Sequence, residues 1–462
     1  MKSNRILVLF LSFFVILSIF LTYYLLYDLT SLKSLIWGKD LTDTEEQVIL
    51  HGDRKLPNFF QPNKLEFKDI VKPFKYIYRN DQSTEWIVDH KGMDAIQDLI
   101  YQHPIKMNRD IPVEDPKFIE DLYVTNHLQI QFADNLTISL LDHFVEDISR
   151  NHKQWLVDAI FYPLDGEKTV YLVNTQSNEY MVGQLDQALA NKDLQTILKE
   201  SALPSITVQG YIGNYGMIYL PDESVTLKDQ IFTLEKIPEH LFLTAFSENA
   251  VLKKTEKASD TLTYFNYQFT LDFTENKQML NIRVNRTEDS LNRNQTDKIL
   301  NSFKYISNYD YWQGPIRLMG AKNSLAQYRR FYAGLPIFTN SKIADYGASR
   351  IHLRNNDSGD VYRYQIPLLV FHAHIPDQSK DVVIESADEI FNIVEDNGYV
   401  LSQFDDMFFA FEWQADMEGD KKAHLIPKWY IKVGDNFYSL DQISSPAFRA
   451  EFSSQNDVPG GE

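Results

Sequence analysis

The sequence predicts an α+β protein, in which an N-terminal transmembrane helix is followed by a multi-domain ectodomain of antiparallel sheets with packed helices. Three observations predict this class. Residues 6–26 form one uninterrupted apolar run. Several later segments alternate apolar and polar residues, which indicates half-buried strands, and others carry apolar residues every three or four positions, which indicates helices. With 462 residues and 44% hydrophobic content, the chain is too apolar for disorder and can form two or three cores.

The apolar run is long enough to cross a membrane. A helix rises about 1.5 Å per residue, so about twenty residues span a hydrocarbon core of about 30 Å. A cleaved signal peptide is the alternative, but its apolar core is shorter and ends in small residues. This run ends at Tyr23, Tyr24 and Tyr27 instead. We therefore expect a retained anchor at residues 6–27, with these tyrosines and Trp37 at the membrane–water interface.

Charge and cysteine content indicate the orientation and the compartment. Lys2 and Arg5 precede the run, while Lys33 and Lys39 follow it, and the positive-inside rule favours a cytoplasmic tip at residues 1–5. The sequence contains no cysteine, which suits an exported chain because unwanted disulfides cannot form. We expect a single-pass protein of a bacterial cell membrane, with a cytoplasmic N-terminus and an extracellular body. The net charge of −19 argues against nucleic acid as a partner.

A connector at residues 28–62 leads into an N-terminal ectodomain region at residues 63–204. Its alternating segments predict strands and its helical periodicities predict helices. Pro104 ends the first helix, since the residue before a proline is disfavoured in helical conformation. The expected elements are a strand beginning at 86–89, a helix at 91–102, a strand at 127–133, a helix at 140–156, a strand at 169–174 and a helix at 181–200.

A middle α+β domain is expected at residues 205–308, a C-terminal α+β domain at residues 309–452 and a disordered tail at residues 453–462. Each of the two domains has a short helix followed by a long hairpin, so we expect them to be a duplicated module. The expected elements are strands from 206 to 220, a short helix after Pro238, a hairpin of 264–273 with 278–284, helices at 294–308 and 324–332, extended chain at 334–338, a strand at 362–375, a helix at 386–396, and a hairpin of 407–413 with 424–434.

Several catalytic signatures are missing from the sequence. No serine has a lysine three residues later, which excludes the penicillin-binding type of acyltransferase. There is no His-Glu-x-x-His helix, phosphate-binding Walker loop, Gly-x-Ser-x-Gly elbow or EF-hand loop. We expect no catalytic, cofactor-binding or metal-binding residues, and no cofactor.

Two weaker patterns invite a chemical interpretation. His372 and His374 lie two apart on an expected strand, so both could face one metal ion, but no third ligand is indicated and a structural role is favoured. Asp405, Asp406 and Glu412 could form the carboxylate pair of a glycosidase. In so acidic a chain, close carboxylates also arise by chance, and a solvated turn is the simpler interpretation.

Arginine and aromatic residues in the C-terminal region have two interpretations each. Arg329 and Arg330 could bind an anionic partner, but on the expected helix they favour a solvated face. The aromatic residues could line a glycan groove or a protein interface, although core positions are more common for such residues at strand spacing. They are Trp312, Tyr332, Trp413, Trp429 and Tyr430.

Within the predicted anchor, Ser18 and Thr22 are four residues apart and share one helix face, whereas Ser12 lies elsewhere. Small hydroxyl residues allow close approach of a second helix and hydrogen bonds across the interface, each contributing about 0.6 to 2 kcal/mol. They also bond to carbonyl groups of their own helix. Ser18 and Thr22 are therefore our candidate partner-binding residues.

Three segments, in this order behind a short basic N-terminus and one anchor, resemble the YycH (WalH) family. They are LQIQFAD at 128–134, FYAGLPIF at 331–338 and LIPKWYIKV at 425–433. The resemblance spans essentially the whole chain, and the C-terminal domain at residues 309–452 also resembles the related regulator YycI. These motifs are signatures of a fold and none of them is catalytic.

The resemblance implies a non-enzymatic protein that associates with YycI and with the sensor histidine kinase WalK (YycG), partly through transmembrane helices. Such a protein modulates two-component signalling that controls cell-wall metabolism, and a homodimer is a further candidate assembly. The sign of regulation differs between species and does not carry over. An anchored cell-wall hydrolase or glycan-binding protein is the main alternative, and a membrane-tethered assembly factor or chaperone is the third.

Overall fold

The computed structural model describes residues 47–48, 65–201, 205–247, 251–258, 260–285, 294–322, 324–339, 344–354, 360–416 and 421–456. Contacts divide the chain into residues 1–46, which lie outside the described part, and residues 47–462, which contain all of it. The predicted anchor, with Ser18, Thr22, Tyr23, Tyr24, Tyr27 and Trp37, lies outside the described residues. None of the helices within the described ranges is long and apolar enough to cross a membrane.

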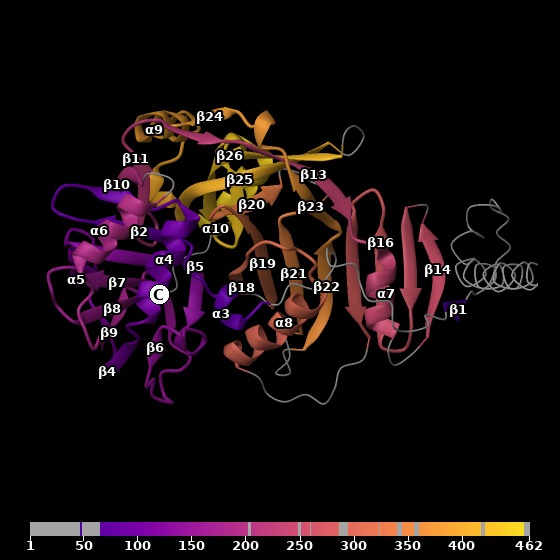
Figure 1. The fold of residues 1–462 in the computed structure, drawn as a ribbon, viewed down its shortest axis with the longest axis horizontal. Coiled ribbons are helices and arrows are strands. Elements are labelled where there is room, and N and C mark those ends of the chain that lie inside the picture. The colour runs from indigo at the N-terminus through magenta and orange to yellow at the C-terminus, as the bar shows by residue number, and fades with distance from the viewer. Residues whose placement is uncertain are drawn as a thin grey trace, which may run out of the picture. The chain divides into compact units, whose positions relative to one another are not determined.

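The first half of the described chain forms a mostly antiparallel sheet of ten strands, in the order β11-β10-β3-β2-β5-β7-β8-β9-β4-β6 (Figure 1). Only its pairing of β4 with β6 is parallel. The strands are β2 (Lys75–Arg79), β3 (Thr84–Trp86), β4 (Ile105–Glu114), β5 (His127–Thr137), β6 (Val145–Glu146), β7 (Leu156–Pro163), β8 (Thr169–Asn174), β9 (Glu179–Gln184), β10 (Ile206–Ile212) and β11 (Met217–Pro221).

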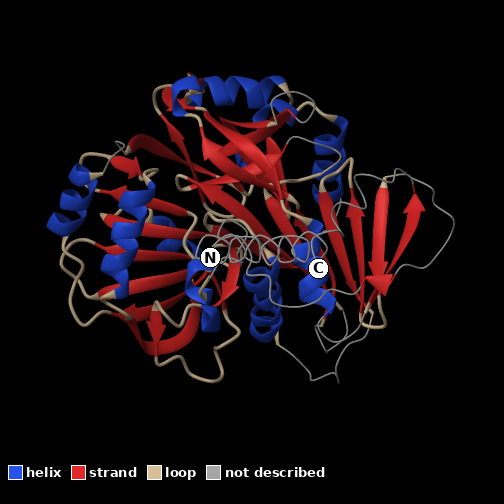
Figure 2. Cartoon of the chain, turned by 45° about the vertical axis from the view of Figure 1, so that its right-hand side comes forward, coloured by secondary structure: helices blue, strands red, loops and turns tan. Residues whose placement is uncertain are grey.

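Helices lie against this sheet (Figure 2). In α4, the side chain of Asp89 caps the first turn by accepting a hydrogen bond from the Gly92 amide, and Met93, Ile96 and Ile100 are buried toward the core. Their spacing of three and four residues gives the helix one apolar face. The helical segments of this half are α3 (Phe67–Ile70), α4 (His90–Tyr101), α5 (Pro116–Leu122), η2 (Ile138–Leu140) and α6 (Asn191–Glu200).

The second half forms a sheet of fifteen described strands, whose main path is β1-β14-β15-β16-β17-β22-β21-β19-β20-β25-β26-β13-β23, with β18 beside β19 and β27 beside β26. Its one parallel pair joins β20 to β25. The strands are β1 (Gln47–Val48), β13 (Gln230–Lys236), β14 (Leu252–Ala258), β15 (Thr261–Phe265), β16 (Phe269–Thr274), β17 (Met279–Val284), β18 (Ile316–Lys322), β19 (Leu325–Tyr332), β20 (Leu335–Thr339), β21 (Ala348–Leu353), β22 (Val361–Pro367), β23 (Leu369–His374), β25 (Asp406–Asp416), β26 (Lys422–Val433) and β27 (Asn436–Ser439).

A two-stranded sheet and the remaining helices complete the second half. The small sheet pairs β12 (Val225–Lys228) with β24 (Asp381–Ile384). Helix α8 lies on β21 and β22, and its Ser302 hydroxyl hydrogen-bonds the Tyr328 hydroxyl at 2.6 Å. The helical segments are α7 (Glu239–Ser247), α8 (Gln295–Tyr309), η3 (Pro376–Gln378), α9 (Ala387–Asp396), η4 (Leu401–Gln403), η5 (Leu440–Gln442) and α10 (Pro446–Asn456).

The structure thus confirms a mixed protein of helices and mostly antiparallel sheets, with five local corrections. Residues 140–156 are not a helix, because Asp147 adopts a φ of 60° that interrupts any helix there. Residues 181–184 belong to β9, so the helix expected at 181–200 begins at Asn191. The strand expected at 362–375 is two strands that break at Leu368. Helix α10 continues to Asn456, inside the tail expected to be disordered.

The fifth correction concerns the helix expected at residues 324–332, because Leu325–Tyr332 form strand β19. Leucine, alanine, glutamine and arginine favour helices, but β19 pairs with β18 on one side and β21 on the other. Ser324 closes the β18–β19 hairpin with a φ of 62°. Pairing with two strands therefore overrides the local helix propensity.

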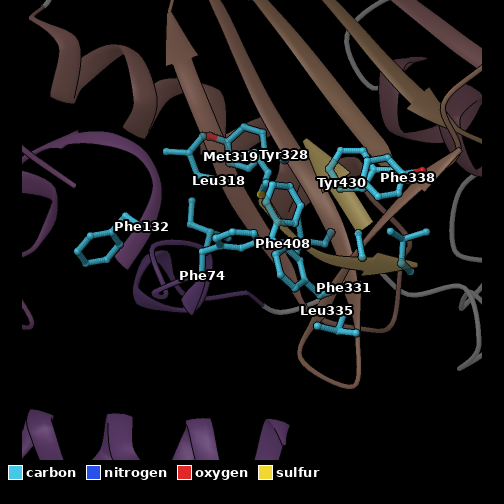
Figure 3. Packing of buried hydrophobic residues seen from close by; sticks show 14 of the residues in the cluster. Phe74, Phe132, Leu318, Met319, Tyr328, Phe331, Leu335, Phe338, Phe408 and Tyr430 are labelled. Atoms are coloured by element: carbon cyan, nitrogen blue, oxygen red, sulfur yellow. The ribbon is translucent and has the colours of Figure 1, made fainter. Parts of the chain in front are cut away.

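The two large sheets share one hydrophobic core. The Trp86 ring on β3 stacks on Phe409 of β25, with centroids 4.8 Å apart, and Phe74 meets Phe408 edge to face at 4.6 Å (Figure 3). The core therefore continues from the N-terminal half into the C-terminal half. Strands β10 and β11 lie beyond residue 204 but still in the ten-stranded sheet, and the expected domain limits stay predictions.

Candidate functional site: a groove where the two sheets meet

A cavity of about 630 Å³ lies where α3 and α4 of the N-terminal half meet β13, β18, β19 and β23 of the C-terminal half. We call it the junction groove. Its size is in the range of small-molecule sites, which are about 300–1,000 Å³. The residues that line it are Leu65, Asp69, Lys72, His90, Asp94, Phe232, Trp312, Gln313, Gly314, Pro315, Ile316, Arg317, Phe331, Tyr332, Ala333, Gly334, Phe371, His372 and His374.

Stacked rings form one wall of the junction groove. Phe232 stacks on Phe371 with centroids 4.3 Å apart and on His374 at 4.8 Å. Trp312 meets Phe371 at 4.6 Å, and Tyr332 meets Phe232 at 5.0 Å. This wall is a rigid aromatic surface, which suits contact with a planar or apolar group.

A β-bulge in β23 brings the consecutive residues Phe371 and His372 to the same groove. Thr233 is opposite Ala373 and Leu234 is opposite Phe371, so His372 is an extra residue of β23. A bulge shifts the alternation of side chains by one. As a result Phe371, His372 and His374 all line the groove.

The turn between β19 and β20 connects the groove to helix α4. Ala333 and Gly334 have φ values of 46° and 86°, the pattern of a two-residue hairpin turn. A Cβ atom on Gly334 would lie 3.2 Å from the Val88 carbonyl oxygen and 3.6 Å from the Cα of His90. The hairpin tip therefore packs directly on the first turn of α4.

Arg317 is the most deeply buried charged group of the groove, with 6% of its surface exposed. Its Nη1 donates to the Pro73 carbonyl oxygen at 2.7 Å, and its guanidinium carbon lies 4.4 Å from the centroid of the Phe331 ring. Burial lowers the pKa of Arg317, while Tyr76 and Asp94 act in the opposite direction. Lys72 is already paired with Asp94 at 3.3 Å.

The two histidines singled out from the sequence, His372 and His374, both line the junction groove. His372 is more than half exposed and lies 3.3 Å from the Glu235 carboxylate, while His374 stacks on Phe232. Within the described ranges, no group of three or more histidine, aspartate or glutamate residues is placed to hold a metal ion.

The three carboxylates considered for glycosidase chemistry have separate partners, and none lines the junction groove. Asp405 accepts hydrogen bonds from the Asn214 side chain at 2.8 Å and the Gly434 amide at 2.6 Å. Asp406 pairs with Lys75, and Glu412 pairs with Lys428 at 3.0 Å. Each carboxylate therefore has a structural partner of its own.

Arg329 and Arg330 are not on a solvated helix face, because both lie on β19 and are 1% exposed. Arg329 pairs with Asp345 at 3.0 Å and Arg330 with Asp310 at 3.4 Å. Arg330 also donates to the carbonyl oxygens of Leu369 and Pro367. The prediction of a solvated face was wrong because it rested on a helix that does not form.

The aromatic residues considered for a binding surface divide into two groups. Trp413, Trp429 and Tyr430 are buried in the shared core. Trp312 and Tyr332 contribute to that core and also line the junction groove. Sequence reasoning did not single out Arg317, although an isolated arginine between Ile316 and Leu318, in an otherwise apolar strand, is a readable signal.

The described part of the chain has two large, mostly antiparallel sheets with packed helices and a groove of ligand size between them. This defines the class as a mixed protein of helices and antiparallel sheets. A family model described as "YycH protein, C-terminal domain" matches residues 216–447. The chain belongs to the YycH family.

Two solved structures are similar to this chain to different degrees. The crystal structure of YycH from Bacillus subtilis matches with a TM-score of 0.65 and 15% identity, covering 82% of this chain and 98% of that chain. At this identity the match shows the fold alone. An uncharacterized protein from Eubacterium rectale ATCC 33656 matches with a TM-score of 0.31 and 10% identity, covering 48% of this chain and 85% of that one. No curated protein matches the chain.

Proposed function

We propose that the protein is a non-enzymatic, membrane-anchored regulator that associates with the sensor histidine kinase WalK (YycG) and a YycI-like partner, and modulates two-component signalling in cell-wall metabolism. The observation that carries the proposal is membership of the YycH family through residues 216–447. The apolar run at residues 6–26 supplies an anchor that can lie beside the membrane helices of a kinase.

The described body suits such a role because its halves are linked by partly buried polar contacts. Lys432 of β26 donates to the Ala133 carbonyl oxygen of β5 at 2.7 Å, and Lys322 of β18 pairs with Asp134 at 2.8 Å. A body held together in this way can act on its anchor as one unit, so that a change in the body can alter the contacts of the anchor with the kinase. Coupling between two arrangements of a kinase requires a differential contact energy of only about 1–3 kcal/mol.

Within this proposal, the membrane contact uses the face of Ser18 and Thr22, with Tyr23, Tyr24, Tyr27 and Trp37 at the interface. The test compares Ser18→Leu/Thr22→Leu with Ser12→Leu, because Ser12 lies on another face of the same predicted helix. We expect the double substitution to reduce association with WalK in a membrane two-hybrid assay and to change the output of a WalK-dependent reporter. Unchanged association and output would exclude this face.

A second comparison tests which part of the chain binds WalK. The full-length protein and a shortened chain ending near Asp40 are each used to co-purify WalK from membranes. Retained binding by the short chain supports recognition within the membrane, and loss of binding moves recognition to the body. If neither chain retains WalK or a YycI-like protein, the regulatory proposal fails.

The duplicated module is the remaining part of the proposal. Helix α7 precedes the β16–β17 hairpin, and α9 precedes the β25–β26 hairpin, which supports the interpretation of residues 205–308 and 309–452 as two related, YycI-like domains. Superposition of the two helix–hairpin units on each other tests it, and unrelated crossing angles between helix and hairpin would refute it.

A further inference from the structure

We infer that the junction groove binds a small ligand that carries an anionic oxygen group, such as a carboxylate, on an aromatic or apolar body. This inference goes beyond association with a kinase and does not depend on it. It rests on unpaired buried donors, on the charge of Arg317 and on the aromatic wall.

Two buried donors that belong to groove residues have no hydrogen-bond partner. They are Nε of Arg317 and Nε1 of Trp312. Leaving a buried donor unpaired is unfavourable. The Nε atoms of Arg329 and Arg330 are unpaired as well, so Arg317 is distinguished by the absence of an ion pair and not by this atom alone. The Arg317 and Trp312 groups are both donors and neither can accept, so the ligand that satisfies them must present acceptors. A cation would find no new acceptor at either atom.

Arg317 lacks the carboxylate partner that the neighbouring Arg329 and Arg330 have. Arg317 is directly opposite Arg329 in the β18–β19 register, and Arg330 follows on the same strand. Arg329 pairs with Asp345 and Arg330 with the buried Asp310. Arg317 instead forms no ion pair within the described residues and hydrogen-bonds one backbone carbonyl. A buried guanidinium is stabilised by an anion, and here the groove is where one can enter.

The other charged groups of the groove already have local partners. The Asp94 carboxylate is paired with Lys72, and Asp69 accepts a hydrogen bond from the Glu66 amide at 2.9 Å. His372 lies beside Glu235. Of the lysine and arginine side chains of the groove, Lys72 and Arg317, Arg317 is therefore the one whose charge is left for a ligand.

The aromatic wall and the size of the cavity define the rest of the ligand. Phe232, Phe371 and His374 form a stack, with Trp312 and Tyr332 at its edges. A planar ring or a branched apolar group would bury its surface there, while its acidic group meets Arg317. A cavity of about 630 Å³ holds such a molecule but not a folded partner.

The test uses N-acetyl-L-tryptophan as the anionic probe and N-acetyl-L-tryptophanamide as its neutral counterpart. Binding to the full-length protein in nanodiscs of neutral lipid is measured by saturation-transfer difference NMR. We expect the acid to bind at least about tenfold more tightly than the amide, because only the acid forms a charge-assisted hydrogen bond with Arg317. Equal binding of the two probes, or no binding of either, overturns the inference.

Two substitutions link the preference to the groove. Arg317→Met should remove the preference for the acid, whereas Arg363→Met, on β22 outside the groove, should leave it unchanged. Because Arg317 is buried, His374→Glu provides a second variant on the exposed part of β23. His374→Glu should weaken binding of the acid by like-charge repulsion, and His374→Gln should not. A preference for the acid that survives both Arg317→Met and His374→Glu also overturns the inference.

Discussion

The ammonium group of Lys75 on β2 pairs with the carboxylate of Asp406 on β25, 331 residues later in the sequence, and both side chains are almost completely buried. Lys75 also donates to the Met407 carbonyl oxygen at 2.8 Å. Burial lowers the pKa of Lys75 and raises the pKa of Asp406, and the attraction between them opposes both shifts. One ion pair thus joins the two large sheets inside the core.

The first prediction concerns this pair. Lys75→Met or Asp406→Leu alone should lower the free energy of unfolding by about 3–5 kcal/mol, because each leaves a buried group without its partner. The double variant Lys75→Met/Asp406→Leu should lose less than either single variant, since two apolar side chains can pack there. Urea unfolding followed by tryptophan fluorescence measures the three values. Additive losses would show that the two groups act independently.

The second prediction concerns the turn that docks on α4. Gly334→Ala introduces a Cβ at a φ of 86° and 3.2 Å from the Val88 carbonyl oxygen. Gly398→Ala is the matched control, because Gly398 has a φ of 81° and nothing within 4 Å of the added atom. In both variants the free energy of unfolding should fall by about 1–2 kcal/mol because of backbone strain.

Gly334→Ala should lower the free energy of unfolding more than this control does. The added Cβ meets the Val88 carbonyl oxygen, which belongs to the backbone and cannot move aside as a flexible side chain can. The same unfolding measurement gives both values. Equal losses would mean that the hairpin tip can withdraw from α4 without cost.

The third prediction concerns Arg330, whose guanidinium group donates to four oxygens. Arg330→Lys keeps the charge but cannot reproduce the planar fork of donors. We expect the free energy of unfolding to fall by about 2–4 kcal/mol. The reason is that buried acceptors would lose hydrogen-bond donors, namely Asp310 and the carbonyl oxygens of Tyr346, Leu369 and Pro367. Arg350→Lys is the control, since Arg350 is one-third exposed and its loss should be below about 1 kcal/mol.

The sequence predicted the elements whose signal is local. Strand β8 at Thr169–Asn174 is rich in β-branched and aromatic residues, α9 begins at a capping box of Ser386 and Glu389, and the β25–β26 hairpin joins two segments rich in apolar and aromatic residues. Each strand or helix in these examples can be recognised from its own short stretch of sequence. They were found without any knowledge of tertiary contacts.

Features that depend on distant partners could not be predicted. Strand β19 resembles a helix in composition and becomes a strand through β18 and β21. The Lys75–Asp406 pair and the junction groove join segments hundreds of residues apart. His372 and His374 were noticed as a pair, but only the bulge in β23 and the rings of Phe232 and Phe371 show which surface they belong to.

The last prediction concerns two buried groups of the ten-stranded sheet that respond to pH in opposite directions. Burial lowers the pKa of His127 from 6.5 to about 4. As pH falls from about 6.5 to about 4, the unfolded chain takes up a proton that the folded chain does not, so stability is lost. Burial raises the pKa of Asp158 from 3.8 to about 6, against hydrogen bonds from Thr175.

The folded chain therefore takes up the Asp158 proton first, and stability is gained as pH falls from about 6 to about 4. Each difference corresponds to about 3 kcal/mol, so the two contributions nearly cancel in the natural protein. His127→Gln should become more stable relative to the natural protein on acidification over this range, and Asp158→Asn should become less stable. Urea unfolding at a series of pH values gives both differences. Parallel pH profiles for the three proteins would show that neither group is held away from its ordinary pKa.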